Sequence, residues 1–156
     1  MKYIIIALAL LQSCVADKPI TITAFTTYNK PVDTTVSLGK EMIYYNNFFL
    51  VSNYRNNQRV ERKVDSFVVG FIAANKYSAN TNEIRFYFYK ETRRTNLVDI
   101  ERNPREIDRY SNQHDLVYYY AVKSNGNTVR EKFKNGQVIE TTAKKVKMPK
   151  FKIIQH

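Results

Sequence analysis

Histidine and cysteine carry much of the acid–base and nucleophilic chemistry of proteins, and this chain has very few of them. It contains two histidines, His114 and His156, and one cysteine, Cys14. A metal site needs several His, Cys or carboxylate ligands at workable spacing, and no such cluster stands out in the sequence. A serine triad would depend on His114, and no Gly-x-Ser-x-Gly motif accompanies it. We therefore expect a protein that is not an enzyme and that uses no metal or cofactor.

One catalytic hypothesis stays open, that of a small secreted ribonuclease. Such an enzyme needs a histidine as general acid, a carboxylate as general base and a cation beside one phosphate. His114 would work with Glu83 or Glu101 as the base. Arg85 or Arg102 would supply the cation. We favour the simpler interpretation, in which His114 lies in a loop before a strand, because most chains of this size hold these residue types.

Positive charge is a stronger functional signal than the few candidate catalytic residues. The chain has 25 Lys and Arg against 14 Asp and Glu, a formal net charge of +11. A lysine-rich segment near the C-terminus attracts phosphate, sulfate or an anionic membrane surface. An arginine next to tyrosines on one strand face adds cation–π and stacking contacts. The candidate polyanion-binding residues are Lys144, Lys145, Lys147, Lys150, Lys152, Arg85, Tyr87, Tyr89, Arg93 and Arg94.

The N-terminus has the pattern of a signal peptide. Lys2 precedes the apolar run 4–11, and small or polar residues follow up to Ala16. This run is too short to cross a bilayer as a helix, and no later run approaches the ~18 apolar residues that spanning requires. We expect cleavage after Ala16, or alternatively at a lipobox that makes Cys14 the lipidated first residue. The sequence thus predicts an exported protein that is not transmembrane.

The elements that position these residues form one domain. A length of 156 residues is typical of a single domain, and the aromatic and β-branched content excludes wholesale disorder. We divide the chain into a signal peptide at 1–16, a single β-rich domain at 17–143, and a basic C-terminal tail or edge strand at 144–156.

Period-two alternation predicts about eight short strands. The clearest covers 83–91, where Ile84, Phe86 and Phe88 point to one face while Arg85, Tyr87 and Tyr89 point to the other. The segment 60–74 starts charged and becomes apolar at 67–72, which predicts a central strand with Gly70 at a bulge or a close approach. One short helix is predicted near 104–112 from the capping pattern at 103–106. The expected fold is all-β and mainly antiparallel, a sandwich or barrel.

A hairpin is predicted around Asn135–Gly136, the dipeptide that a type I′ turn prefers. A two-residue turn would pair Phe133 with Val138. The same register would set Glu131 opposite Glu140, an unfavourable like-charge pair that argues against it.

These observations favour an exported, non-enzymatic, β-rich binding module. Its basic, tyrosine-rich face would engage an anionic glycan, an anionic membrane surface or a protein partner, with nucleic acid less favoured. Two alternatives remain. One is an envelope-associated structural protein or a lipoprotein anchored at Cys14, and the other is the ribonuclease that uses His114.

Overall fold

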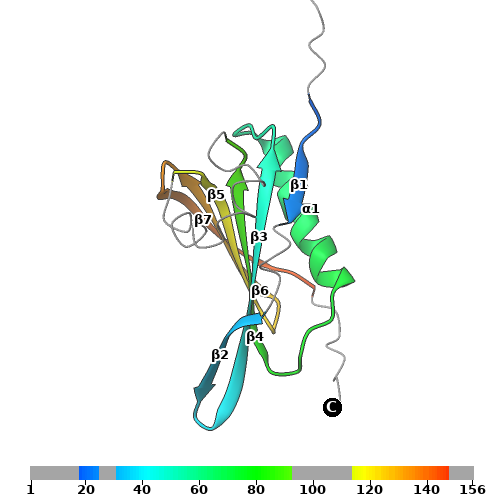
Figure 1. Ribbon diagram of the computed structural model, residues 1–156, viewed down its shortest axis with the longest axis vertical. Helices are drawn as coiled ribbons and strands as arrows, with labels where there is room; N and C mark the ends of the chain where they lie inside the picture. The colour runs from blue at the N-terminus through cyan, green and yellow to red at the C-terminus, as the bar shows by residue number, and fades with distance from the viewer. Residues whose placement is uncertain (1–17, 25–30, 93–113, 148–156) are drawn as a thin grey trace, which may run out of the picture.

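The computed structural model of the chain describes residues 18–24, 31–92 and 114–147. Within these residues, seven strands form one sheet and a single helix packs on it (Figure 1). The fold is therefore mostly β, as predicted. The elements in chain order are β1 (Thr21–Ala24), β2 (Pro31–Ser37), β3 (Lys40–Ser52), α1 (Gln58–Ala74), β4 (Thr81–Lys90), β5 (Leu116–Lys123), β6 (Asn127–Lys134) and β7 (Gln137–Lys145).

The sheet is open and mixed. Its order is β1-β3-β4-β5-β6-β7, and β2 also pairs with β3. β1 and β2 share one edge of β3, since β1 pairs with residues 49–52 and β2 with residues 40–45. β3 and β4 run parallel, with α1 as the crossover between them, and the other neighbours are antiparallel. The predicted sandwich or barrel is not seen, because the described strands make a single sheet that does not close.

Residues 60–74 differ most from the sequence-based prediction, because a helix replaces the expected central strand. Val60, Val64, Val68 and Ile72 follow each other at intervals of four residues and form one apolar stripe, and each is at most 1% exposed. The Asn57 side chain caps the helix by accepting a hydrogen bond from the Val60 amide at 3.0 Å. The helix is regular, so no strand bulge exists here.

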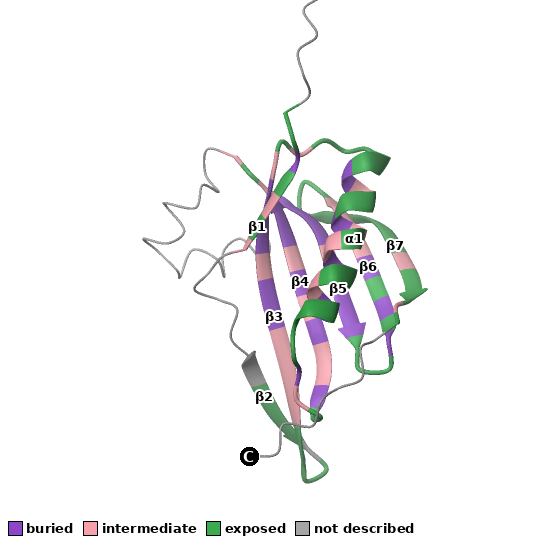
Figure 2. Cartoon of the chain, turned by 90° about the vertical axis from the view of Figure 1, so that its right-hand side faces the viewer, coloured by how far each residue is buried: buried purple, intermediate pink, exposed green. Residues whose placement is uncertain are grey.

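The main core lies between α1 and the sheet face that it covers (Figure 2). Ile84, Phe86 and Phe88 of β4 all point to this face, which confirms the predicted alternation, and none of them is exposed. Phe49 of β3 stacks on Phe88 at 5.2 Å and meets Phe67 of the helix edge-on at 4.8 Å. Each fully buried Phe contributes roughly 2–3 kcal/mol, so this aromatic contact holds helix and sheet together.

The β6–β7 hairpin confirms the predicted turn. Asn135 and Gly136 both adopt positive φ angles, 53° and 78°, as a type I′ turn requires. Phe133 pairs with Val138, also as predicted. The predicted opposition of Glu131 to the glutamate at position 140 is wrong, because a bulge shifts the register next to Phe133 and sets Glu131 opposite Thr141.

A second hairpin joins β2 to β3 and projects beyond the rest of the sheet (Figure 1). Its turn residues, Leu38 and Gly39, have φ angles of 51° and 74°. Glycine adopts this conformation freely, whereas leucine rarely does. The Leu38 side chain is fully exposed. The predicted signal peptide at 1–16, the helix predicted near 104–112 and the tail beyond 147 lie outside the described residues.

Candidate binding face

Three aromatic side chains lie side by side on the sheet face turned away from α1. The register places Phe48 of β3 opposite Tyr87 of β4, and Tyr87 opposite Tyr119 of β5. The Phe48 and Tyr87 rings stack at 4.8 Å with planes 13° apart, and the Tyr87 and Tyr119 rings are 5.1 Å apart at 47°. Each ring is partly exposed. We call Phe48, Tyr87 and Tyr119 the aromatic row.

Arg85 lies beside the aromatic row and is held by two neighbours. Its guanidinium carbon is 4.7 Å from the centre of the Tyr44 ring, within cation–π range. Its Nε donates to Glu83 Oε1 at 2.6 Å. Partial burial disfavours the charged form, but the hydrogen bond and charge of Glu83 outweigh it, and the pKa of Arg85 is raised. We call the aromatic row together with Tyr44, Glu83 and Arg85 the aromatic face.

The Tyr119 hydroxyl stays protonated well into the alkaline range. Burial raises its pKa above the ordinary tyrosine value, and Tyr87 and Glu83 add to this effect. The hydroxyl therefore offers both a donor and an acceptor to a ligand at neutral pH.

The packing of the aromatic row limits what it can recognise. Phe48 covers one side of the Tyr87 ring and Tyr119 packs against the same ring from the next strand. Base or sugar stacking needs open ring faces, and here the rings cover one another. The Tyr87 ring therefore has little open face left for a base or a sugar.

Among the described residues next to the aromatic row, two negative side chains accompany two positive ones. Lys123 lies opposite Glu83 in the β4–β5 register, and Glu131 lies opposite Tyr119 in the β5–β6 register. The two carboxylates offset Arg85 and Lys123. Long-range attraction of a polyanion is correspondingly weak at this surface.

The residues predicted to bind a polyanion do not gather at this face. Arg85 and Tyr87 belong to it, but Tyr89 is only 1% exposed and packs with Leu50 and Leu116. Lys144 lies on the α1 side of the sheet, where its Nζ is 3.0 Å from Asp65 of the helix. Lys145 and Lys147 are exposed at the end of β7. The others, Arg93, Arg94, Lys150 and Lys152, lie outside the described residues.

His114 is not assembled with the carboxylate and arginine on β4. It is exposed and lies just before β5, whose Leu116 pairs with Tyr89 at the far end of β4. Glu83 pairs at the other end of the same ladder, six β4 residues away, which is roughly 20 Å along a strand. The version of the ribonuclease hypothesis that uses Glu83 and Arg85 is therefore unsupported. Glu101 and Arg102 lie outside the described residues.

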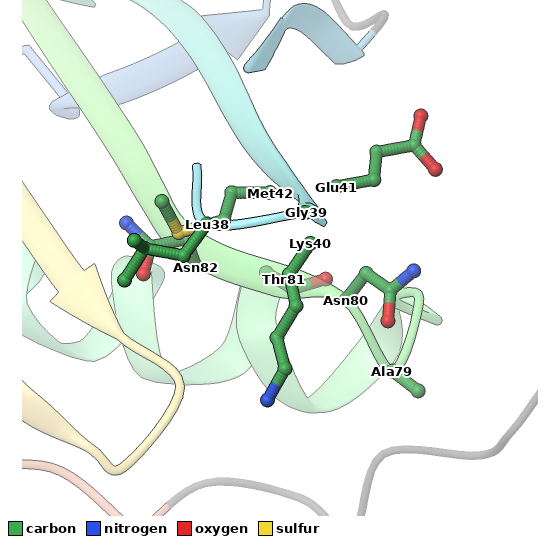
Figure 3. A pocket seen from close by; sticks show the side chains of 9 residues that line it. All are labelled: Leu38, Gly39, Lys40, Glu41, Met42, Ala79, Asn80, Thr81 and Asn82. Atoms are coloured by element: carbon green, nitrogen blue, oxygen red, sulfur yellow. The ribbon is translucent and has the colours of Figure 1, made fainter. Parts of the chain in front are cut away.

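A groove lies between the turn end of the projecting hairpin, residues 38–42, and residues 79–82 at the start of β4 (Figure 3). It has a volume of about 870 Å³ and exists because β4 begins opposite Ile43, so that residues 40–42 of β3 extend past its start. The side chains of Leu38, Met42 and Asn82 gather on one side of it, while Lys40 points away from them (Figure 3). Its lining includes one acid and one base, Glu41 and Lys40, whose side chains point in different directions (Figure 3).

Sequence reasoning identified only Arg85 and Tyr87 of the aromatic face as binding candidates. It missed Phe48, Tyr119 and Tyr44. Alternation along each strand indicates which residues share a face. It does not indicate which strands are neighbours, and only the register brings these rings together.

Comparison of the chain with protein-family models, with curated proteins and with solved structures returned no match. Among the described residues, no group of three or more His, Cys, Asp or Glu is placed to hold a metal ion. No helix in that part of the chain is long and apolar enough to span a bilayer.

Proposed function

We propose that this chain is an exported, non-enzymatic module that binds a protein partner through its aromatic face. The observation that carries the proposal is the row of Phe48, Tyr87 and Tyr119, partly exposed beside Arg85 on the sheet face that α1 leaves uncovered. Tyr, Phe and Arg are enriched in protein interfaces and in their hot spots. Support for export comes from the leader pattern, and support for a non-catalytic role from the scarcity of histidine and cysteine.

Two features favour a protein over an anionic glycan or an anionic membrane. The Tyr87 ring has Phe48 on one side and Tyr119 on the other, and this combination of apolar rings with tyrosine hydroxyls suits the mixed apolar and polar contacts of a protein interface. The charges of the face cancel, so attraction to a polyanion has no focus there.

Photo-crosslinking tests this proposal. Benzoylphenylalanine replaces Tyr87, which keeps an aromatic ring in the row, and in a control protein it replaces Val69, which is 47% exposed on α1. Both proteins are irradiated with the medium and envelope fraction of the producing cells. We expect a discrete protein adduct from position 87 and none of that mass from position 69.

Competition makes the test specific. Excess unlabelled wild-type chain should suppress the adduct, and a Tyr119→Ala chain should suppress it at least about tenfold less well, because hot-spot residues at interfaces cost 1–3 kcal/mol or more when truncated. Identical adducts from both positions, no adduct at all, or equal competition by wild type and Tyr119→Ala would each overturn the proposal.

A further inference from the structure

The last strand of the described sheet is an exposed edge. β7 has β6 on one side and no described strand on the other. Every residue of β7 except Thr142 is exposed, and Val138 and Ile139 are 48% and 51% exposed. An edge of this kind presents unpaired backbone N–H and C=O groups to which another strand can pair.

The charges along β7 suit one particular partner, which is β7 of a second copy. The strand has a single acid, Glu140, and two bases, Lys144 and Lys145. Antiparallel pairing about a two-fold axis at Thr142 sets Glu140 opposite Lys144 of the second copy, and by symmetry this pair occurs twice. The Lys144 ammonium also contacts Asp65 of its own helix at 3.0 Å, but its side chain is 47% exposed and it has three N–H donors, enough for both carboxylates. Opposite charges directly across an antiparallel pair are stabilising.

Neighbouring two-fold registers lose this complementarity. An axis at Thr141 sets Glu140 opposite Thr142, and an axis at Ala143 sets it opposite Val146. An axis at Glu140 itself opposes two carboxylates, which is destabilising. The bulge that places Ile139 outside the β6 register ends the regular part of β7 at Glu140. The regular segment 140–145 thus contains both members of the charge pair, Glu140 and Lys144, and the axis residue Thr142.

The Oε2 oxygen of Glu140 can accept the contact from Lys144 of the second copy. Arg130 and Thr142 both donate to Oε1, at 2.6 and 3.0 Å, and no described residue bonds to Oε2. The side chain is 46% exposed. Its pKa is lowered by these two hydrogen bonds, so the carboxylate is charged at neutral pH.

We propose that two copies of this chain pair through β7 in antiparallel register, with a two-fold axis at Thr142 perpendicular to the sheet. The axis keeps both α1 helices on one side of the continuous sheet. Both aromatic faces then point to the other side, where a partner with repeated sites meets two of them at once. This inference stands on the β7 edge and does not depend on the proposed function.

Disulfide trapping tests the register. In a Cys14→Ser full-length background, Thr142→Cys supplies the only thiol, and the two cysteines oppose each other across the axis. Directly opposed residues in an antiparallel pair have Cα atoms 4.5–5.5 Å apart, within the range for a disulfide. We expect mild oxidation to give a covalent dimer at least about tenfold faster than the control Val69→Cys, whose exposed site lies on α1.

Sedimentation velocity in 0.15 M salt supplies the second readout. We expect the wild-type chain to be dimeric at about 100 μM and Thr142→Lys to be monomeric, because it brings two like charges together at the axis. Thr141→Lys is the matched control, since its side chain points to the other face and opposes Ala143. A monomeric wild type, a dimer that Thr142→Lys leaves intact, or equal trapping of the Thr142→Cys and Val69→Cys variants would overturn the proposal.

Discussion

Lys132 of β6 lies directly opposite Glu140 of β7. A regular two-residue turn at Asn135–Gly136 would instead pair Lys132 with Ile139, so the register is shifted by one residue. The bulge beside Phe133 makes this shift. Without it Glu131 would face Glu140, and with it a lysine does. The same lysine also forms an ion pair with Glu61 of α1. One bulge thus replaces a repulsion with an attraction and ties the hairpin to the helix.

Replacing Lys132 with methionine should therefore destabilise the fold. The Lys132 side chain is only 12% exposed, and its loss leaves Glu61, itself 20% exposed, without its ion pair. We expect the free energy of unfolding to fall by roughly 1–3 kcal/mol, the cost of leaving a buried polar group unsatisfied. Urea unfolding measures this. Lys134→Met, at an exposed position two residues along β6, is the control and should change it by less than about 0.5 kcal/mol.

The apolar stripe of α1 predicts a sharp difference between two adjacent valines. Val68 is 1% exposed and packs on the sheet, whereas Val69 is 47% exposed. Val68→Ala should lower the free energy of unfolding by roughly 2 kcal/mol, because it removes buried methyl groups and leaves a cavity. Val69→Ala should leave it within about 0.5 kcal/mol. Equal losses for the two variants in urea unfolding would contradict the helical assignment of this segment.

The strands were largely predictable from the sequence and the helix was not. Alternation in β4 is strict, so the faces of Ile84 and Arg85 followed directly from it. The run at 67–72 in α1 is apolar and rich in β-branched residues. Read as a strand it would be apolar on both faces, which locally favours a β interpretation. The helical signal lies in the wider spacing of Val60, Val64 and Val68, and tertiary packing of that stripe overrides the local preference.

The binding face and the sheet topology depend on information that a single sequence does not contain. Tyr87 meets Phe48 only because α1 crosses over and returns β4 parallel to β3. Local patterns predict turns such as Asn135–Gly136, but parallel pairing joins segments far apart in the chain, and nothing local marks them. For the same reason, the sequence could not show that Arg85 and Lys144, both candidates for polyanion binding, lie on opposite faces of the sheet.

The turn at Leu38 predicts a stabilising substitution. Leu38 has a φ of 51° and a fully exposed side chain, so the fold keeps a conformation that costs leucine about 1 kcal/mol and receives no packing in return. Leu38→Asn should raise the free energy of unfolding by roughly 0.5–1 kcal/mol, since Asn-Gly is preferred in type I′ turns. Leu38→Ala keeps the unfavourable φ and should give no gain. A stability of Leu38→Asn no higher than that of Leu38→Ala would contradict this account of the turn.

Buried tyrosines predict that the protein loses stability in alkali. Burial raises the pKa of Tyr77, Tyr118 and Tyr120 above the ordinary value near 10. The unfolded chain therefore releases these protons first, so their contribution is complete below pH 10 and is lost as the pH rises above it. Each such tyrosine lowers the free energy of unfolding by up to about 1.4 kcal/mol per pH unit. Urea unfolding between pH 9 and 11.5 measures the slope, with tyrosinate absorbance followed in parallel. Tyr118→Phe removes one titrating group and should make the slope shallower by about that amount, and an unchanged slope would show that this hydroxyl titrates normally in the folded chain.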